Sequence, residues 1–137
     1  AKYHPGGTLG KKLYLRVSDL VVNNEVPKVS PDASIKDVIV EISEKRLGTT
    51  AVVEGDRLIG IITDGDIRRM LEKNTDIKSL SAADVMSADP IQVESETMAV
   101  EALDVMEDNN ITQILVTENG EYVGVVHFHD LLKEGII

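Results

Sequence analysis

The chain has 137 residues and a formal net charge of −10, with 42% apolar residues, four aromatic residues and no cysteine. This length suits one compact domain or two small intertwined halves, and the apolar fraction is sufficient for a buried, mostly aliphatic core. The negative charge argues against nucleic acid as a partner, the lack of cysteine excludes disulfides and suits the cytoplasm, and the apolar runs are too short to span a membrane.

The first 16 residues, AKYHPGGTLGKKLYLR, differ in composition from the rest of the chain. Their charged residues are four cations and no acid, whereas the remainder holds 10 cations and 24 acids. An abrupt change of this kind indicates a junction with another domain. Since the chain does not begin with methionine, we interpret residues 1–16 as the remnant or linker of an upstream domain in a longer protein.

The rest of the sequence is a duplication. A shift of 64 positions aligns residues 29–69 with residues 93–133 without a gap, and most apolar positions coincide. Self-similarity over this length indicates two copies of one structural unit. We therefore divide the chain into repeat 1 (residues 17–80) and repeat 2 (residues 81–137).

Repeat 1 contains a predicted amphipathic helix over residues 34–46. Apolar residues recur at helical spacing, charged residues occupy the opposite face, and Ser34 is a good N-cap. The strands TAVVE and RLIGIIT follow, and the Gly-Asp dipeptide between them predicts a β-hairpin. A short helix over residues 67–73 ends the unit.

Repeat 2 predicts the same order of elements. A helix over residues 97–109 precedes the strands ILVTE and YVGVVH, which Asn119-Gly120 separates, and a short helix over residues 131–134 follows. Neither repeat can bury its apolar helix face and its sheet alone, so we expect the two to pack together with pseudo-twofold symmetry. The predicted fold class is α+β, with two β-α-β-β-α repeats.

The segment GIITDGDIRR (residues 60–69) joins the second strand of repeat 1 to its last helix. Thr63 and Asp66 flank the expected helix start, where free backbone N–H groups can bind a phosphate and Asp66 can accept the hydroxyls of a ribose. Arg68 or Arg69 would neutralise the phosphate. A simple helix cap requires the same residues, so a ligand site and a cap both remain open.

In repeat 2 the equivalent positions are His127, Phe128, His129 and Asp130. A His-x-His pair on an extended segment points both imidazoles to one side, and with Asp130 it could hold a metal. No further histidine is near in the sequence. We favour a site without metal, in which both imidazoles line a cleft between the repeats and donate to an anionic ligand.

Signatures of catalysis are missing from the sequence. It contains no Gly-x-Ser-x-Gly, no Walker loop and no Rossmann fingerprint. Its many carboxylates fit a solvated acidic surface. We therefore expect a binding or interaction module with no enzymatic activity of its own.

Both repeats resemble the cystathionine-β-synthase (CBS) domain, whose tandem pairs are called Bateman modules. The resemblance covers residues 17–134: GIITDGDIRR matches the ligand motif of the family, and GVVHFHDLLK keeps Gly124 and Asp130 but has His127 at the hydroxyl position. It implies a nucleotide between the repeats, regulation of an attached domain, and homodimers. The surfaces expected to pair are the apolar stripes of helices 34–46 and 97–109 with Ile67, Leu71, Leu131 and Leu132.

The opening segment KYHPGGTLGKKL, followed by such a pair, resembles arabinose-5-phosphate isomerases. These enzymes join a sugar isomerase (SIS) domain to a CBS pair and make the precursor of 3-deoxy-D-manno-octulosonate (Kdo), a sugar of lipopolysaccharide and some capsules. The resemblance implicates His4 in catalysis, but only in a complete parent protein. We therefore expect no isomerase activity and no cofactor in this chain alone.

The same resemblance suggests a regulatory ligand. CMP-Kdo, the activated product made downstream of these isomerases, is expected to bind more tightly than adenine nucleotides. The residues expected to bond the base, the ribose and the anionic groups are Thr49, Thr50, Thr112, Gln113, Asp66, Asp130, Arg68, Arg69, His127 and His129, with Asp32 and Asp84 as further candidates. The alternative is a purely structural dimerisation module with an empty cleft.

Overall fold

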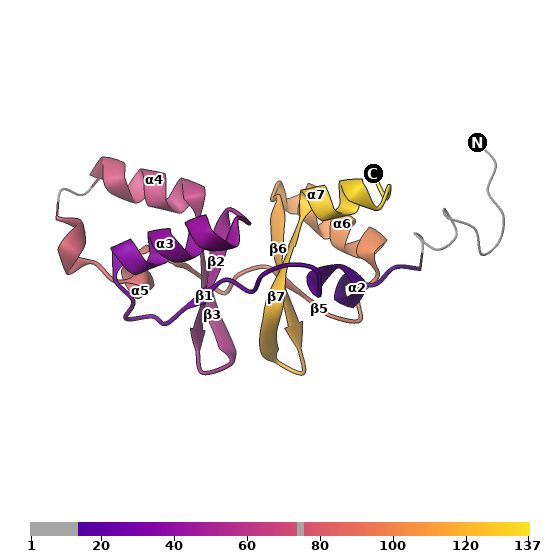
Figure 1. Ribbon diagram of the computed structural model, residues 1–137, viewed down its shortest axis with the longest axis horizontal. Coiled ribbons are helices and arrows are strands. Elements are labelled where there is room, and N and C mark those ends of the chain that lie inside the picture. Colours follow the sequence, from indigo (N-terminus) through magenta and orange to yellow (C-terminus); the bar gives the residue numbers. More distant parts are fainter. Residues whose placement is uncertain (1–13, 74–75) are drawn as a thin grey trace.

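The computed structural model describes residues 14–73 and 76–137, and it places the two repeats side by side (Figure 1). His4 and most of the expected junction segment lie outside the described residues. The elements of repeat 1 are β1 (Lys28–Val29), α3 (Ile35–Lys45), β2 (Thr49–Glu54), β3 (Arg57–Thr63) and α4 (Asp64–Lys73). Those of repeat 2 are β5 (Gln92–Glu94), α6 (Ala99–Asn109), β6 (Gln113–Glu118), β7 (Glu121–His127) and α7 (Phe128–Lys133).

Further short elements precede each of these units. In repeat 1, the helix α2 (Val17–Val21) comes before β1. Between α4 and β5 lie a 3₁₀ turn (Ile77–Ser79), the helix α5 (Ala82–Val85) and the strand β4 (Ser87–Ala88), of which α5 and β4 belong to repeat 2. The predicted β-α-β-β-α order is thus confirmed in both repeats. None of the described helices is long and apolar enough to cross a membrane.

The strands form a mixed sheet in the order β1-β2-β3-β7-β6-β5, and β4 pairs with β3. β1 and β5 are parallel to their neighbours, whereas both hairpins are antiparallel. The two halves of the sheet meet at one residue pair, Arg57 with Glu121. Both hairpins also contain a shift in strand register, between Val52 and Val53 in repeat 1 and between Val116 and Thr117, 64 positions later, in repeat 2. The predicted pseudo-twofold arrangement is therefore visible at the level of register.

The last helix of each repeat begins three residues earlier than the sequence predicted. α4 starts at Asp64 and α7 at Phe128, directly after the preceding strand. The reason is the cap: the carboxylates of Asp66 and Asp130 accept the backbone N–H of Thr63 and His127 at 2.9 and 2.7 Å. These bonds satisfy N–H groups at the helix start, so no separate turn is needed.

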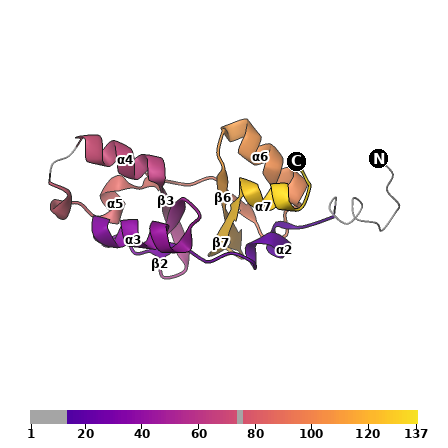
Figure 2. The same cartoon turned by 45° about the horizontal axis from the view of Figure 1, so that its top comes forward.

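Each repeat is covered by the segment that opens the other repeat. In repeat 2, Val17, Leu20 and Val21 of α2 pack with Ala102 and Met106 of α6. In the opposite sense, Ala82 of α5 packs with buried residues of repeat 1, which are Val38, Ile42, Val52 and Ile62. Figures 1 and 2 show α2 beside β7 and α5 beside α3. The two repeats are consecutive in the sequence, but their cores are interleaved.

Two glycines leave the space for this crossing. A Cβ built on Gly124 of β7 would lie 2.5 Å from Cγ2 of Val21, and one on Gly60 of β3 would overlap the side chain of Met86. The segments that carry Val21 and Met86 therefore approach the backbone of β7 and β3 more closely than a side chain at Gly124 or Gly60 would permit.

The apolar surface left for a second copy is smaller than the sequence suggested. Leu131 and much of the α3 and α6 stripes, including Ile42 and Met106, are buried inside the chain itself. The exposed large apolar side chains of α3, α4 and α7 are Ile39, Val40, Leu71 and Leu132.

Candidate functional site

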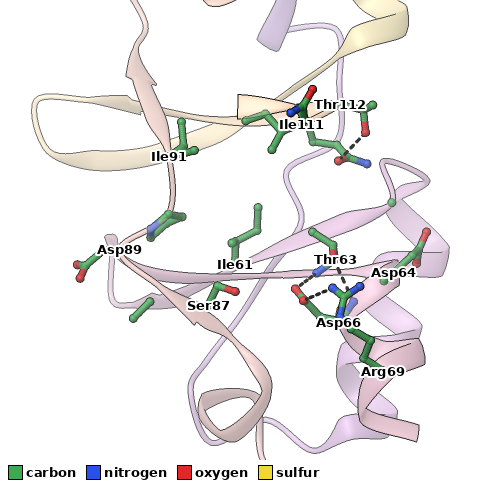
Figure 3. Close-up of a pocket in the computed structure, with 16 residues that line it drawn as sticks. Ile61, Thr63, Asp64, Asp66, Arg69, Ser87, Asp89, Ile91, Ile111 and Thr112 are labelled. Atoms are coloured by element: carbon green, nitrogen blue, oxygen red, sulfur yellow. Dashed lines mark hydrogen bonds and ion pairs between the residues drawn. The ribbon is translucent and has the colours of Figure 1, made fainter. Parts of the chain in front are cut away.

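The inter-repeat pocket lies where α4 of repeat 1 faces the start of β6 in repeat 2 (Figure 3). Its volume is about 620 Å³, within the range of small-molecule sites. The residues from repeat 1 are Gly48, Ile61, Thr63, Asp64, Gly65, Asp66 and Arg69, and those from repeat 2 are Ser87–Ile91 and Asn110–Gln113. The predicted candidates Thr63, Asp66, Arg69, Thr112 and Gln113 are thereby brought together.

Thr63 and Asp66 form a reciprocal cap at the start of α4. The N–H of Asp66 donates to Thr63 Oγ1 at 3.2 Å, while Asp66 Oδ2 accepts the N–H of Thr63. The other carboxylate oxygen, Oδ1, accepts Nη2 of Arg69 at 2.8 Å. The side chain of Asp66 is 18% exposed and that of Arg69 is 60% exposed, so the pair opens to solvent on the arginine side.

The helix start offers fewer free donors than the sequence suggested. The N–H of Asp64 donates to the carbonyl of Gly48 at 3.0 Å, and that of Asp66 is used by Thr63. Gly65 lies between them, and Arg69 folds over it, since a Cβ at Gly65 would be 3.2 Å from the guanidinium. Arg69 is therefore the group that brings positive charge to this end of the pocket.

The opposite wall comes from repeat 2. Gln113 Nε2 donates to the carbonyl of Leu47 at 3.1 Å, and its Oε1 accepts the hydroxyl of Thr112 at 3.0 Å. Gly48 has φ of 72°, and a Cβ there would lie 2.7 Å from Gln113 Nε2. Glycine at this position therefore permits the contact that joins the two repeats across the pocket.

Among the expected ligand residues of repeat 1, Thr49, Thr50 and Arg68 do not line this pocket. Thr49 and Thr50 are fully buried, and their hydroxyls donate to the carbonyls of Ile62 and Ala51. They begin a central strand, so they present no hydroxyl to a base. Arg68 is exposed on α4 outside the pocket lining, because it is one residue, about 100° of helix, away from Arg69.

The histidines also lie elsewhere, so the expectation of a single cleft that joins them to Thr63 and Asp66 is wrong. His127, His129 and Asp130 line a second pocket of about 340 Å³, the histidine pocket. Its other lining residues are Asn23, Asn24, Glu25, Lys45, Arg46, Leu47 and Lys133. The pseudo-twofold symmetry explains the separation, since equivalent motifs of the two repeats occupy equivalent but distinct positions.

His127 ends β7 and caps α7 with its ring. Its Nδ1 accepts the N–H of His129 at 3.0 Å, and the two ring centroids are 4.6 Å apart. The predicted extended His-x-His segment is wrong, because His129 already belongs to the helix. Burial, and then the nearby His129, lower the pKa of His127, against a smaller opposite effect of Asp130. In the described part of the chain, no group of three His, Cys, Asp or Glu side chains is arranged to hold a metal.

Known proteins with similar sequences identify the two repeats. The sequence profile of the CBS domain matches residues 17–73 and again residues 82–136. This chain belongs to the CBS domain family. It is 45% identical to "Arabinose 5-phosphate isomerase KdsD" of Yersinia pestis and 43% identical to the protein of that name from Escherichia coli K12. Each match covers 98% of this chain but only 42% of the relative, so the chain spans less than half of their length.

Solved structures share the tandem CBS fold. A CBS domain protein from Pyrobaculum aerophilum, complexed with AMP, is 25% identical with a TM-score of 0.77, over 90% of this chain and all of that one. A conserved protein from Pyrococcus horikoshii gives the same TM-score at 23% identity, over 90% of this chain and 93% of that one. The predicted CBS pair is thus confirmed.

The remaining acidic candidates lie outside both of these CBS pockets. Asp32 accepts the hydroxyl of Ser30 and lines a separate surface hollow. Asp84 accepts the N–H and the hydroxyl of Ser81 and so caps α5. Conversely, Ile61 and the segment 87–91 line the inter-repeat pocket without having been predicted. No local pattern marks them, because they reach the pocket only through the pairing of β4 with β3.

Acidification is expected to weaken the cap that His127 provides. Because the folded CBS pair lowers the pKa of His127, its contribution to stability is full above the unfolded pKa of about 6.5 and is lost as the pH falls through the folded value. Replacing His127 by Thr, the residue that repeat 1 has at this position, keeps a cap acceptor and removes the titration. Between about pH 7.5 and about pH 5.5, the Tm of His127→Thr should fall less than that of the unmodified chain.

A second variant is His129→Asn, which keeps the cap bond because that bond uses only the backbone N–H of His129. It removes a ring that helps to lower the pKa of His127, so its fall in Tm should lie between those of His127→Thr and the unmodified chain. Thermal unfolding followed by circular dichroism gives the three Tm values at each pH. An equal fall in Tm for His127→Thr and for the unmodified chain would show that His127 is not the group responsible.

Proposed function

We propose that this chain is the nucleotide-binding regulatory module of a longer sugar-phosphate isomerase. The observation that carries the proposal is the inter-repeat pocket, where the cap of α4 in one CBS repeat faces the start of β6 in the other. A ligand held there contacts both repeats at once. Its binding is therefore linked to their relative position, which is what regulation of an attached domain requires.

The contacts available in this pocket suit a nucleoside monophosphate. Asp66 keeps an oxygen within reach of ribose hydroxyls once Arg69 turns away, and the Arg69 guanidinium is then free to meet the phosphate. Ile61 and Ile111 extend toward each other from the two repeats, and they give a base an apolar surface on either side (Figure 3). The AMP complex of the relative from Pyrobaculum aerophilum supports this class of ligand.

The parent enzyme in this proposal is an arabinose-5-phosphate isomerase. The curated relatives that match 98% of this chain carry that name, and more than half of their length lies outside the match. We propose that an SIS domain precedes residue 17 in the parent, that His4 acts there in proton transfer, and that the enzyme works in the cytoplasm. The Kdo made from its product would serve lipopolysaccharide or capsule.

Within the nucleotides, we propose that CMP-Kdo binds more tightly than adenine nucleotides. Thr112 and the carboxamide of Gln113 offer polar contacts for a small base, and the described residues that line the pocket include no aromatic side chain to stack on a purine. The charge of the lining favours ligands with few anionic groups. Asp64, Asp66 and Asp89 face one arginine, so a triphosphate meets more repulsion than a sugar nucleotide.

Calorimetric titration of the chain with CMP, CMP-Kdo, AMP and ATP tests both the function and this ranking. The expected order places CMP-Kdo first and ATP last, and each ligand that binds should raise the Tm, since it stabilises only the folded state. Tighter binding of AMP or ATP than of CMP-Kdo would refute the ranking, but the proposal of a nucleotide site would stand. No heat and no change in Tm with any of the four would favour the purely structural module.

Homodimerisation through the CBS pair is the second function we propose. Its basis in the structure is the set of side chains exposed on α3, α4 and α7, which are Ile39, Val40, Leu71 and Leu132. All four lie on helices that the resemblance to CBS pairs expects to pair, and contact with a second copy would remove them from water. Sedimentation at micromolar concentration, compared with the Leu71→Glu and Leu132→Glu variants, measures whether these residues hold the copies together.

A further inference from the structure

The helices α3 and α6 occupy equivalent places in the two repeats, and each presents an outward face to solvent. Figure 1 shows α3, α4, α6 and α7 along one side of the molecule and the hairpin turns along the other. The outward face of each helix consists of four residues at the i, i+3, i+4 and i+7 spacing, which places side chains together. They are Lys36, Ile39, Val40 and Ser43 on α3 and Val100, Leu103, Asp104 and Glu107 on α6.

Repeat 1 carries cations at two positions where repeat 2 is apolar. With the shift of 64 positions, Lys36 of α3 corresponds to Val100 of α6, and Arg68 of α4 corresponds to Leu132 of α7. Both cations are exposed. The helix side of repeat 1 is therefore more positive than that of repeat 2.

The acids of the outward faces differ in the same sense. Val40 and Ser43 of α3 correspond to Asp104 and Glu107 of α6, and all four side chains are exposed. The other exposed acids are common to both helices and do not distinguish the repeats; they are Asp37 and Glu44 on α3 and Glu101 and Asp108 on α6. The two outward faces thus have complementary charges, positive on α3 and negative on α6.

These charges are not compensated inside the chain. Within residues 14–73 and 76–137, no carboxylate lies at ion-pairing distance from Lys36 or Arg68, and no cation lies at that distance from Asp104 or Glu107. The last turn of α6 contains no basic residue, although cations are the side chains that stabilise a helix C-terminus. A cationic surface from outside the chain would therefore stabilise α6.

We propose that two copies of this chain pair in an antiparallel arrangement, with repeat 1 of each copy on repeat 2 of the other. The inference rests on the proposed homodimer and specifies how its surfaces meet. Lys36 of one copy then faces Asp104 and Glu107 of the other. A parallel pair would instead bring the two α6 helices together, and like charges placed opposite each other at an interface repel.

The antiparallel arrangement also separates the points at which the two chains enter the dimer. The entry segment is bonded to repeat 2: the carbonyl of Leu15 accepts the N–H of Ala99 at 2.8 Å, and the N–H of Val17 donates to the carbonyl of Thr97 at 2.8 Å. The two copies of repeat 2 lie at opposite ends of an antiparallel dimer. The upstream domains of the proposed parent are then attached at opposite ends as well.

Cysteine cross-linking distinguishes the two arrangements, because the chain has no cysteine of its own. Val40→Cys and Asp104→Cys each introduce one thiol, at equivalent exposed positions of α3 and α6. A long bifunctional maleimide should join the chains in an equimolar mixture of the two variants but not in either variant alone. Cross-linking within a single variant, or none in a mixture that sediments as a dimer, would overturn the antiparallel arrangement, but the proposal of a homodimer would stand.

Charge reversal tests the contact itself, by sedimentation at low salt where exposed charges are least screened. Lys36→Glu and Asp104→Lys should each weaken the dimer about tenfold, because each contact occurs twice in a symmetric pair. The double variant with both substitutions in one chain should regain most of the lost affinity, since opposite charges face each other again. In a parallel dimer each substituted position would face its own copy, and the double variant would regain nothing.

The control is Asp56→Lys, which makes the same change of charge as Asp104→Lys but lies in the turn between β2 and β3, away from the helices (Figure 1). It should leave the affinity of the dimer unchanged. Full affinity in both Lys36→Glu and Asp104→Lys would overturn the antiparallel arrangement. Sedimentation of the unmodified chain only as a monomer would overturn the homodimer and the arrangement together.

Discussion

Asp66→Ala is expected to weaken nucleotide binding in the inter-repeat pocket by roughly 5- to 150-fold, which corresponds to about 1–3 kcal/mol. The variant removes the proposed acceptor of the ribose hydroxyls and also releases Arg69, whose guanidinium is held by Asp66 at 2.8 Å. Arg69 alone can still attract the phosphate, so the loss should be large but not complete. Calorimetry with AMP and with CMP-Kdo measures it.

The same substitution also removes half of the α4 cap, and Asp130→Ala separates this effect from ligand binding. Asp130 makes the equivalent bond to the N–H of His127 at the start of α7, so both variants lose a similar cap. Asp130→Ala should lower the Tm comparably and keep full nucleotide affinity. An equal loss of affinity in both variants would mean that the effect is one of stability, and unchanged affinity in Asp66→Ala would remove Asp66 from the site.

Gly124→Ala is expected to destabilise the fold by roughly 2–4 kcal/mol. The new Cβ would lie 2.5 Å from Cγ2 of Val21, and Val21 is a buried β-branched residue with little freedom to turn away. The backbone of Gly124 also has φ of 153°, a value that side chains disfavour. Urea unfolding of the variant and of the unmodified chain gives the difference in free energy.

A second substitution shows whether the crossing of α2 over repeat 2 is the cause. Val21→Ala removes the clashing methyl groups, so the double variant Val21→Ala, Gly124→Ala should recover part of the stability lost in Gly124→Ala. The interaction energy from this cycle is expected to be favourable and at least about 0.5 kcal/mol. Additive losses would mean that Val21 does not contact β7 in solution, and that repeat 2 is covered by something other than α2.

Much of the local structure was predictable because local rules govern it. The hairpins follow from two-residue turns at Gly55 and Asn119, and α3 begins after Ser34 because the hydroxyl accepts the N–H of Asp37 at 3.1 Å. The bounds of α3, β2 and β3, moved by 64 positions, are the bounds of α6, β6 and β7. The cap of α4 was also readable, although its early start was missed because the strand runs into the helix without a loop.

The sequence by itself determined the duplication, the order of elements in each CBS repeat, and the pair Thr63 and Asp66 as a cap. Only the tertiary structure decided which residues share a pocket. Arg69 lines the inter-repeat pocket and Arg68 does not, because one step along a helix turns the side chain by about 100°. The histidines occupy a pocket of their own because symmetry separates equivalent motifs, and Gln113 reaches the carbonyl of Leu47, 66 positions away, only after both repeats have packed.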